Sequence, residues 1–173
     1  MRERESGLQT VTEVARGSRP AGESGAEGGT LLRRLLLALF VFGGGGLGAE
    51  LFLLEHTGSA QQWIPLAALG AGLAASAAVA FRPSPRTVRT FQAVMAVFVL
   101  AGLVGVYLHF GSNLEFEREM DPSSRGFDLF VRVMYGATPL LAPGALAQLG
   151  LLGLVYAFRH PALHHRQPLE ENR

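Results

Sequence analysis

Four long apolar segments limit the folds that this chain can adopt. They cover residues 31–54, 63–81, 88–110 and 138–158. Each is close to the roughly 20 residues that a helix needs to cross about 30 Å of hydrocarbon. None shows the period-two alternation of a strand in a membrane β-barrel. The sequence therefore predicts an all-α fold, a membrane-embedded four-helix bundle.

The composition agrees with a membrane protein and excludes several kinds of chemistry. The chain has 173 residues, of which 49% are hydrophobic and 17% are charged, and its formal net charge is +1. This near-zero charge gives no indication of nucleic acid as a partner. Cysteine and lysine are both absent, which excludes disulfides, thiolate metal ligands and lysine Schiff bases. The bias toward Ala, Gly, Leu and Arg is typical of a GC-rich bacterial genome.

Polar tails flank the apolar segments, and their arginines predict the orientation. Residues 1–30 are rich in Gly, Ser, Glu and Arg, so we expect a disordered tail there, and a second polar tail at residues 159–173. Twelve of the fifteen arginines lie in these tails, at the start of the first span or in the second connection. The positive-inside rule then places both termini in the cytoplasm. We expect a multi-pass protein of the bacterial cytoplasmic (inner) membrane.

The third connection, residues 111–137, is too long for a simple turn. Asp121 and Pro122 predict a helix start within it. The apolar residues that follow share one helix face, namely Phe127, Phe130, Val131 and Met134. We expect a short amphipathic helix that lies on the outer membrane surface or caps the bundle. A helix that docks a partner protein is the alternative.

Small residues spaced four apart predict where the spans pack, because helices in lipid approach most closely where side chains are small. The first span contains four consecutive glycines, at positions 43–46. We expect helix packing at Gly44, Gly48, Gly72, Gly105 and Gly153. Such close packing leaves little room for a wide aqueous pore.

Glu50 is an ionisable residue inside the first apolar segment, and such residues usually face the interior with a partner. His56 and His109 are expected at the same outer end of the bundle. The two histidines would ligate a haem, or together with Glu50 a metal ion. Alternatively, Glu50 and a histidine would exchange protons or hydrogen-bond a quinone head group. In a structural interpretation, the histidines are interfacial and one hydrogen bond holds Glu50.

Other polar residues suggest weaker hypotheses. The acidic residues near the outer face would attract cations or a basic partner; they are Glu55, Glu115, Glu117, Glu119 and Asp121. Gln148 is expected to form an interhelical hydrogen bond, and His160 is expected to lie in a solvated tail. The sequence contains no nucleotide-binding loop, no H-E-x-x-H motif and no nucleophile with a base. It therefore predicts no catalytic residue and no enzyme.

Two stretches resemble small four-span bacterial integral membrane proteins of unassigned activity. They are AELFLLEHTGSAQQWIPL at residues 49–66 and GATPLLAPGALAQLGLLGLVYAFRHPAL at residues 136–163. The resemblance implies the topology and no activity. The leading hypothesis is a structural or accessory subunit without a cofactor, packed in the lipid bilayer with itself or with a membrane-protein partner. A redox, metal or quinone-binding protein is the alternative, and a small-solute or proton transporter is a third hypothesis.

Overall fold

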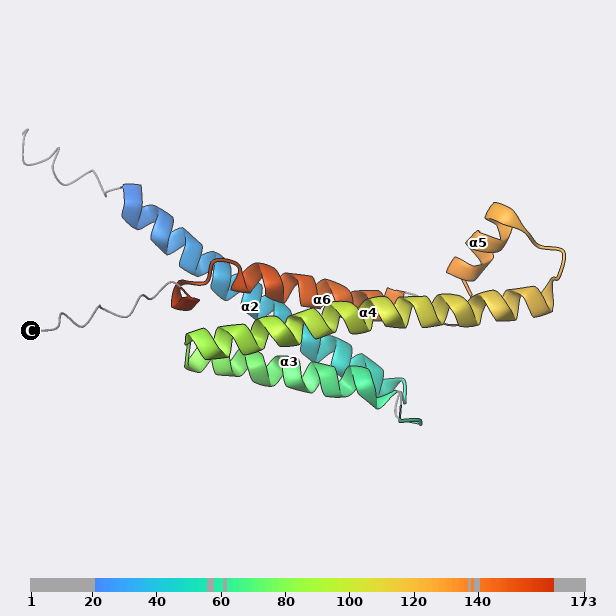
Figure 1. The fold of residues 1–173 in the computed structure, drawn as a ribbon, viewed down its shortest axis with the longest axis horizontal. Coiled ribbons are helices and arrows are strands. Elements are labelled where there is room, and N and C mark those ends of the chain that lie inside the picture. Colours follow the sequence, from blue (N-terminus) through green and yellow to red (C-terminus); the bar gives the residue numbers. More distant parts are fainter. Residues whose placement is uncertain (1–20, 56–57, 61, 137, 139–140, 164–173) are drawn as a thin grey trace, which may run out of the picture. The chain divides into compact units, whose positions relative to one another are not determined.

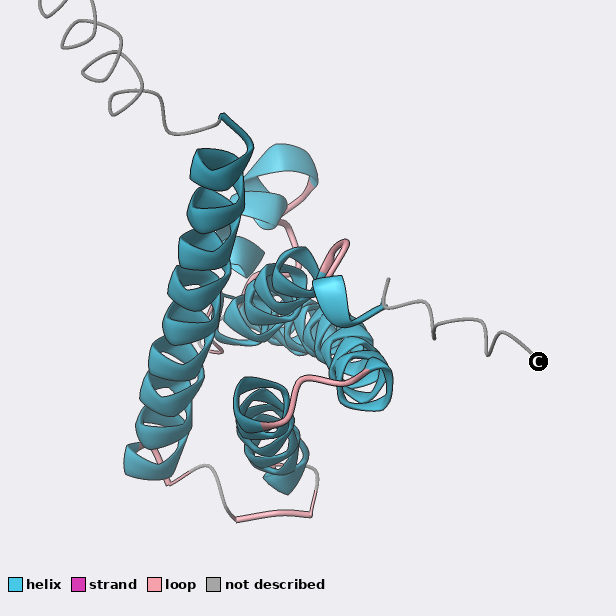
Figure 2. Cartoon of the chain, turned by 90° about the vertical axis from the view of Figure 1, so that its left-hand side faces the viewer, coloured by secondary structure: helices cyan, strands magenta, loops and turns pink. Residues whose placement is uncertain are grey.

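The computed structural model describes residues 21–55, 58–60, 62–136, 138 and 141–163. Within these residues, all regular structure is helical and no strand occurs (Figures 1 and 2). The elements are α2 (Ala21–Leu53), α3 (Trp63–Phe81), α4 (Pro85–Met120), α5 (Gly126–Met134), α6 (Leu141–Ala157) and the 3-10 turn η1 (Pro161–Leu163). The predicted all-α class is confirmed for the described residues.

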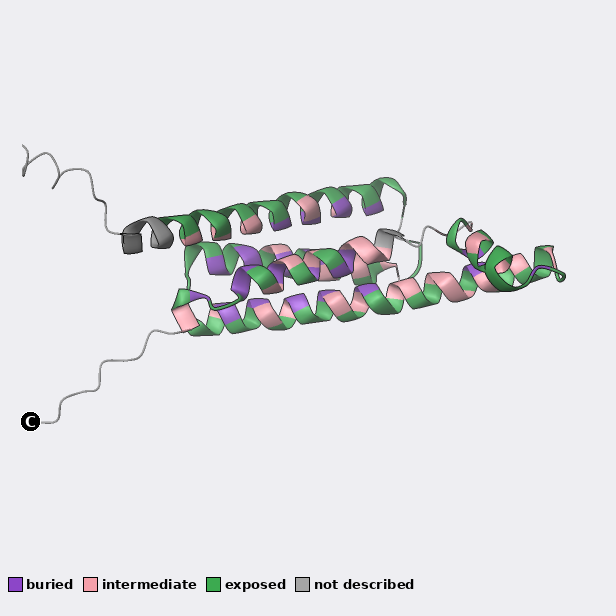
Figure 3. Cartoon of the chain, turned by 90° about the horizontal axis from the view of Figure 1, so that it is seen from above, coloured by how far each residue is buried: buried purple, intermediate pink, exposed green. Residues whose placement is uncertain are grey.

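In the part of the chain that the structure describes, three helices are long and apolar enough to cross a membrane: residues Glu27–Leu53 of α2, all of α3, and α4. Only 17% to 28% of the residues in their apolar windows are buried, so most of their apolar side chains face outward (Figure 3). Phe42 and Phe81, for example, are more than 80% exposed. A chain folded in water rarely exposes so much continuous apolar surface. Length and surface together indicate a membrane-embedded protein.

The first helix begins earlier than the sequence predicts. α2 begins at Ala21, whereas the apolar segment begins at residue 31, so the predicted disordered tail of residues 1–30 overlaps the helix. Its residues 1–20 lie outside the described residues. Extending an existing helix forms a backbone hydrogen bond for each residue fixed, which explains how polar residues can join it. The chain divides into two compact units, residues 1–35 and 36–173, and the helix packing belongs to the second unit.

α4 continues past residue 110, where the third apolar segment ends, and so occupies the first part of the predicted loop 111–137. Its 36 residues correspond to a helix of about 54 Å, well beyond the roughly 30 Å of hydrocarbon. Ser84 caps its start: the Ser84 hydroxyl accepts a hydrogen bond from the Thr87 N–H at 3.1 Å, and the Thr87 hydroxyl accepts one from the Ser84 N–H at 2.9 Å.

α4 is the central helix of this unit, because it contacts α3, α5, α6 and η1. α4 and α6 are antiparallel, so the residue numbers of contacting positions rise along α4 and fall along α6. Matching positions are Gly102 with Ala147, Gly105 with Pro143, Met95 with Gly150, and Phe91 with Gly153. The register of α4 and α6 is therefore fixed along most of α6.

Aromatic side chains form the centre of the core. Phe40 of α2 lies 5.8 Å, between ring centroids, from both Phe91 and Phe98 of α4. Tyr156 of α6 lies 5.4 Å from Phe91. On α3, a Cβ atom added at Gly72 would lie 2.5 Å from Phe98 and 3.1 Å from Phe40. α2, α3, α4 and α6 therefore all contribute to one core.

The contact at Gly102 generates the first prediction. A Cβ atom there would lie 2.5 Å from the backbone nitrogen of Ala147 and 2.7 Å from the carbonyl oxygen of Pro143. Gly102→Ala would force α4 and α6 apart, and we expect it to destabilise the protein by about 1–3 kcal/mol. Thermal unfolding in detergent measures the effect.

Gly111→Ala is the matched control on the same helix, because nothing lies within 4 Å of a Cβ atom at Gly111. Alanine is the better helix former, so this variant should unfold at the same temperature as the parent or slightly above it. Equal stability of the two variants would contradict the close contact at Gly102.

Candidate functional site

Glu50 lies in the last turns of α2, which ends at Leu53, and its side chain is exposed. The expectation that it faces the interior is therefore wrong for this chain alone. Leu47 and Leu51 are buried and occupy the inward positions of the same turns. Glu50 is one position from Leu51 and three from Leu47, so it lies beside the buried face. Because Glu50 lies close to the helix end, its carboxylate can extend toward water.

The predicted histidines are placed differently from each other. His56 lies outside the described residues, and His109 is half-buried on α4. Among the residues that the structure describes, no three His, Asp or Glu side chains form a group suited to a metal ion. Because the predicted set of Glu50, His56 and His109 includes a residue outside that range, a haem or metal site at these residues stays a prediction.

The glycines chosen for helix packing fall into two groups. Added Cβ atoms at Gly72, Gly105 and Gly153 would overlap side chains of neighbouring helices; the distance at Gly105 is 2.6 Å, to Pro143 Cβ. At Gly44 and Gly48 the nearest atoms are leucine methyl groups of α3, at 3.7 Å and 3.8 Å. Gly44 and Gly48 of α2 thus pack loosely against α3. Gly43 of the same run is closer to a neighbour, since an added Cβ atom would lie 2.9 Å from Leu149 of α6.

Two further polar residues differ from expectation. Gln148 is exposed, so it lies on the outer side of α6 and away from the helix contacts. His160, expected in the solvated tail 159–173, is only 8% exposed. Its ring lies 5.6 Å from that of Tyr156, and its Nδ1 accepts a hydrogen bond from the Ala162 N–H at 3.2 Å. Because η1 contacts α4, the start of this tail packs on the helical core.

Asn113 is a buried polar side chain that sequence reasoning missed, and it is 1% exposed. Its amide nitrogen donates hydrogen bonds to the carbonyl oxygens of Val133 at 3.0 Å and Thr138 at 2.9 Å. Its amide oxygen accepts one from the Thr138 N–H at 2.9 Å. Gly136 makes room for it, since a Cβ atom there would lie 2.5 Å from Asn113 Cγ. Asn113 therefore ties α4 to the end of α5 and to the segment before α6.

This arrangement generates the second prediction. Asn113→Asp keeps the shape but replaces the donating amide with a carboxylate that faces two carbonyl oxygens. A buried polar group left without its partner costs about 1–3 kcal/mol, so we expect a loss of stability of at least this size. Thermal unfolding in detergent measures it, with Ser112→Asp on the exposed neighbouring position as the matched control. A variant as stable as the control would show that Asn113 does not hold this connection.

A polar network closes the turn between α4 and α5. Asp121 accepts hydrogen bonds from the hydroxyl and the N–H of Ser123, at 2.6 Å and 3.1 Å. Arg132 lies 3.1 Å from Asp128 and 3.6 Å from Asp121. The Ser123 hydroxyl, then its N–H, and also the charge of Arg132 lower the pKa of Asp121. Asp121 thus follows the last residue of α4 and organises a turn, whereas the sequence predicted that it starts a helix.

The third prediction concerns this carboxylate. A lowered pKa in the folded chain means that the ionised Asp121 stabilises the turn above its ordinary pKa, and that this contribution is lost as pH falls through the lowered value. Ser123→Ala removes the largest cause and should raise the pKa of Asp121 toward its ordinary value. A pH titration of the Asp121 carboxyl carbon by NMR measures it, with Ser112→Ala as the control. An unchanged midpoint would contradict the role of the Ser123 hydroxyl.

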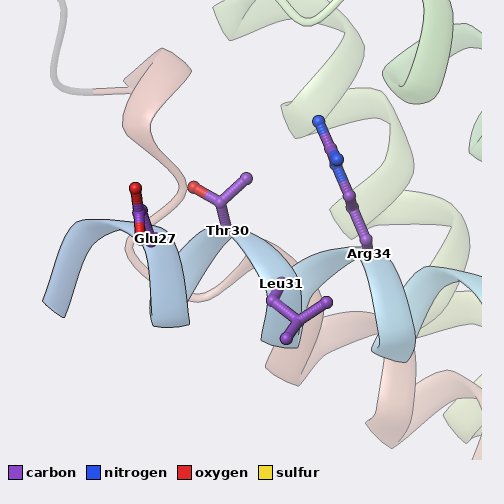
Figure 4. A pocket seen from close by; sticks show the side chains of 4 residues that line it. All are labelled: Glu27, Thr30, Leu31 and Arg34. Atoms are coloured by element: carbon purple, nitrogen blue, oxygen red, sulfur yellow. The ribbon is translucent and has the colours of Figure 1, made fainter. Parts of the chain in front are cut away.

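One shallow hollow lies on the surface of α2, lined by Glu27, Thr30, Leu31 and Arg34 (Figure 4). These four residues follow the spacing i, i+3, i+4 and i+7, so they form a single face of one helix. The hollow is therefore a depression along a helix surface and offers no enclosed volume for a ligand.

Comparisons of the sequence and the structure with protein-family models, curated proteins and solved structures find no match. The fold and the surface alone therefore define the class of protein. That class is an all-helical protein with helices long and apolar enough to span a membrane.

Proposed function

We propose that the chain is a multi-pass protein of the bacterial inner membrane and acts as a structural or accessory subunit of a membrane complex. Its spanning helices are α2, α3, α4 and α6, which together form a four-helix bundle in the bilayer. α6, with 17 residues, is at the lower limit of a spanning helix. The arginines outside the third connection support an orientation with both termini in the cytoplasm, by the positive-inside rule.

The observation that carries this proposal is the contrast between a filled interior and an apolar exterior. Phe91, Met95 and Phe98 are fully buried between the helices. At Gly102, the backbone of α4 approaches the backbone of α6 so closely that no side chain fits between them. A wide aqueous pore needs the opposite arrangement, with polar side chains around an open centre. The geometry therefore favours a packing role over transport.

The apolar exterior of the helices can contact lipid or another membrane protein. Large apolar side chains are exposed along α2, α3, α4 and α6, for example Phe42, Phe81, Leu103 and Val155. Exposed glycines interrupt them on α2, since nothing lies within 4 Å of an added Cβ atom at Gly45 or Gly46. Bulky and small residues on one outer face suit close contact with another spanning helix.

Purification in mild detergent from cells that produce the tagged chain at its native level tests the proposal. Alkaline carbonate should leave the chain in the membrane fraction, and the solubilised chain should elute as a particle larger than its monomer. Release by carbonate would contradict membrane insertion. An intact, inserted chain that elutes as a monomer would contradict the subunit role.

The same preparation tests the redox, metal or quinone alternative built on Glu50, His56 and His109. Visible absorption, metal analysis and lipid extraction report on haem, metal ions and quinones, respectively. A colourless preparation without metal or quinone agrees with a structural subunit, while a stoichiometric cofactor would favour the alternative.

A further inference from the structure

The surface of α5 has three faces that differ in their contacts. Leu129 and Val133 share the face toward α4, where Val133 is fully buried. Asp128 and Arg132 share a second face and pair with each other at 3.1 Å. The third face carries no charge and is largely exposed, with Val131 half-buried. We call it the aromatic stripe, and it consists of Phe127, Phe130, Val131 and Met134.

The polar groups of the two other faces have partners within the chain. Asn113 accounts for the carbonyl of Val133, and the charged side chains of Asp128 and Arg132 bond to each other, to Ser124 and to Asp121. Gly126, at the start of α5, has a φ of 63°, a conformation that glycine adopts readily, and so allows the sharp return toward α4. α5 is therefore held in one orientation. Among the described residues, its aromatic stripe stays largely exposed and meets α4 where Phe130 lies beside Phe110.

The aromatic stripe continues the apolar outer surface of α4. The ring of Phe130 lies 6.4 Å from that of Phe110, the last residue of the apolar segment of α4, and 6.2 Å from that of Phe127. Tyr107, about one turn before Phe110 on the same side of α4, is exposed. Apolar side chains thus pass from the proposed spanning part of α4 onto α5 through the contact of Phe110 with Phe130. Figure 1 shows α5 near the far end of α4, which it contacts.

The level of these side chains along α4 is set by two contacts. Gly105 lies against Pro143, close to the start of α6, and Asn113 bonds to Thr138, which precedes α6. The outer end of α6 therefore lies beside α4 between these two residues, and Phe110 lies at the same level. Beyond it, α4 carries the charged residues Glu115, Glu117, Arg118 and Glu119. Phe110 and Phe130 thus lie just before the part of α4 in which charged residues occur.

We propose that the aromatic stripe of α5 inserts into the boundary between the hydrocarbon and the head groups of the outer leaflet. The occupant of this face is lipid, because the stripe continues the lipid-facing surface of α4 and lies where that surface ends. Aromatic residues are enriched at this depth of a bilayer. The anchor holds the acidic end of α4 above the membrane. The inference rests on the proposed membrane insertion.

Fluorescence quenching in vesicles tests this proposal, because the chain has a single tryptophan, Trp63. In a Trp63→Phe parent, one tryptophan is introduced at Phe127 or at Phe130, and in the control at the exposed Glu119 on α4. Each variant is reconstituted in phosphatidylcholine vesicles that carry bromine near the head-group end of the acyl chains. Acrylamide in the aqueous phase is the second quencher, and circular dichroism checks folding.

For tryptophan at positions 127 and 130, we expect loss of most of the fluorescence to brominated lipid and little loss to acrylamide. The control at position 119 should show the reverse. Quenching of 127 and 130 by acrylamide alone would overturn the proposal, since the stripe would then face water. Protection from both quenchers would also overturn it, in favour of a protein partner or a second copy.

If Phe130→Trp does not fold, Met134→Trp provides a second probe at the other end of the aromatic stripe, where Met134 is 43% exposed. Carbonate extraction of the parent distinguishes a failure of the lipid anchor from a failure of the proposed membrane insertion. A parent that stays in the membrane while the stripe faces water contradicts only the lipid anchor. A parent that is released contradicts the proposed membrane insertion itself.

Discussion

Close contact between the backbones of α4 and α6 is the interaction on which the rest of the structure depends. In lipid, little hydrophobic driving force brings helices together, so close packing and interhelical hydrogen bonds decide their association. Gly102 and Gly150 supply that contact, since added Cβ atoms would overlap backbone atoms of Ala147 and Met95. The resulting register brings Thr138 to Asn113 and so determines where α5 lies.

The sequence predicts the helices well where a single physical requirement controls them. A spanning helix needs a long apolar segment, and the predicted segment 63–81 has the same bounds as α3. Hydropathy does not report where a helix ends, however. Residues 112–121 contain no glycine or proline, so α4 continues through polar residues until the turn at Asp121. For the same reason, α2 begins in a segment that its composition assigned to a tail.

The contacts at the candidate site were harder to predict, because they depend on residues far apart in the chain. Asn113 bonds to backbone groups 20 and 25 residues away, and only the fold brings them together. Small-residue spacing identified Gly105 and Gly153, but it missed Gly102 and Gly150, where the closest approaches involve backbone atoms. The prediction for Glu50 followed the usual rule that an ionisable residue in a span faces the interior. Glu50 is exposed instead, because it lies near the helix end.

The central claim is that α4 is one continuous helix that crosses the bilayer and extends beyond it. Spin labels on single cysteines in this cysteine-free chain test it, at Val97, Val104, Leu108, Ser112 and Glu119, all exposed on one face. Collision with oxygen should dominate at Val97 and Val104, and collision with a water-soluble nickel complex at Ser112 and Glu119, with a crossover near Leu108. Nickel access at Val97 and Val104 equal to that at Glu119 would contradict the claim.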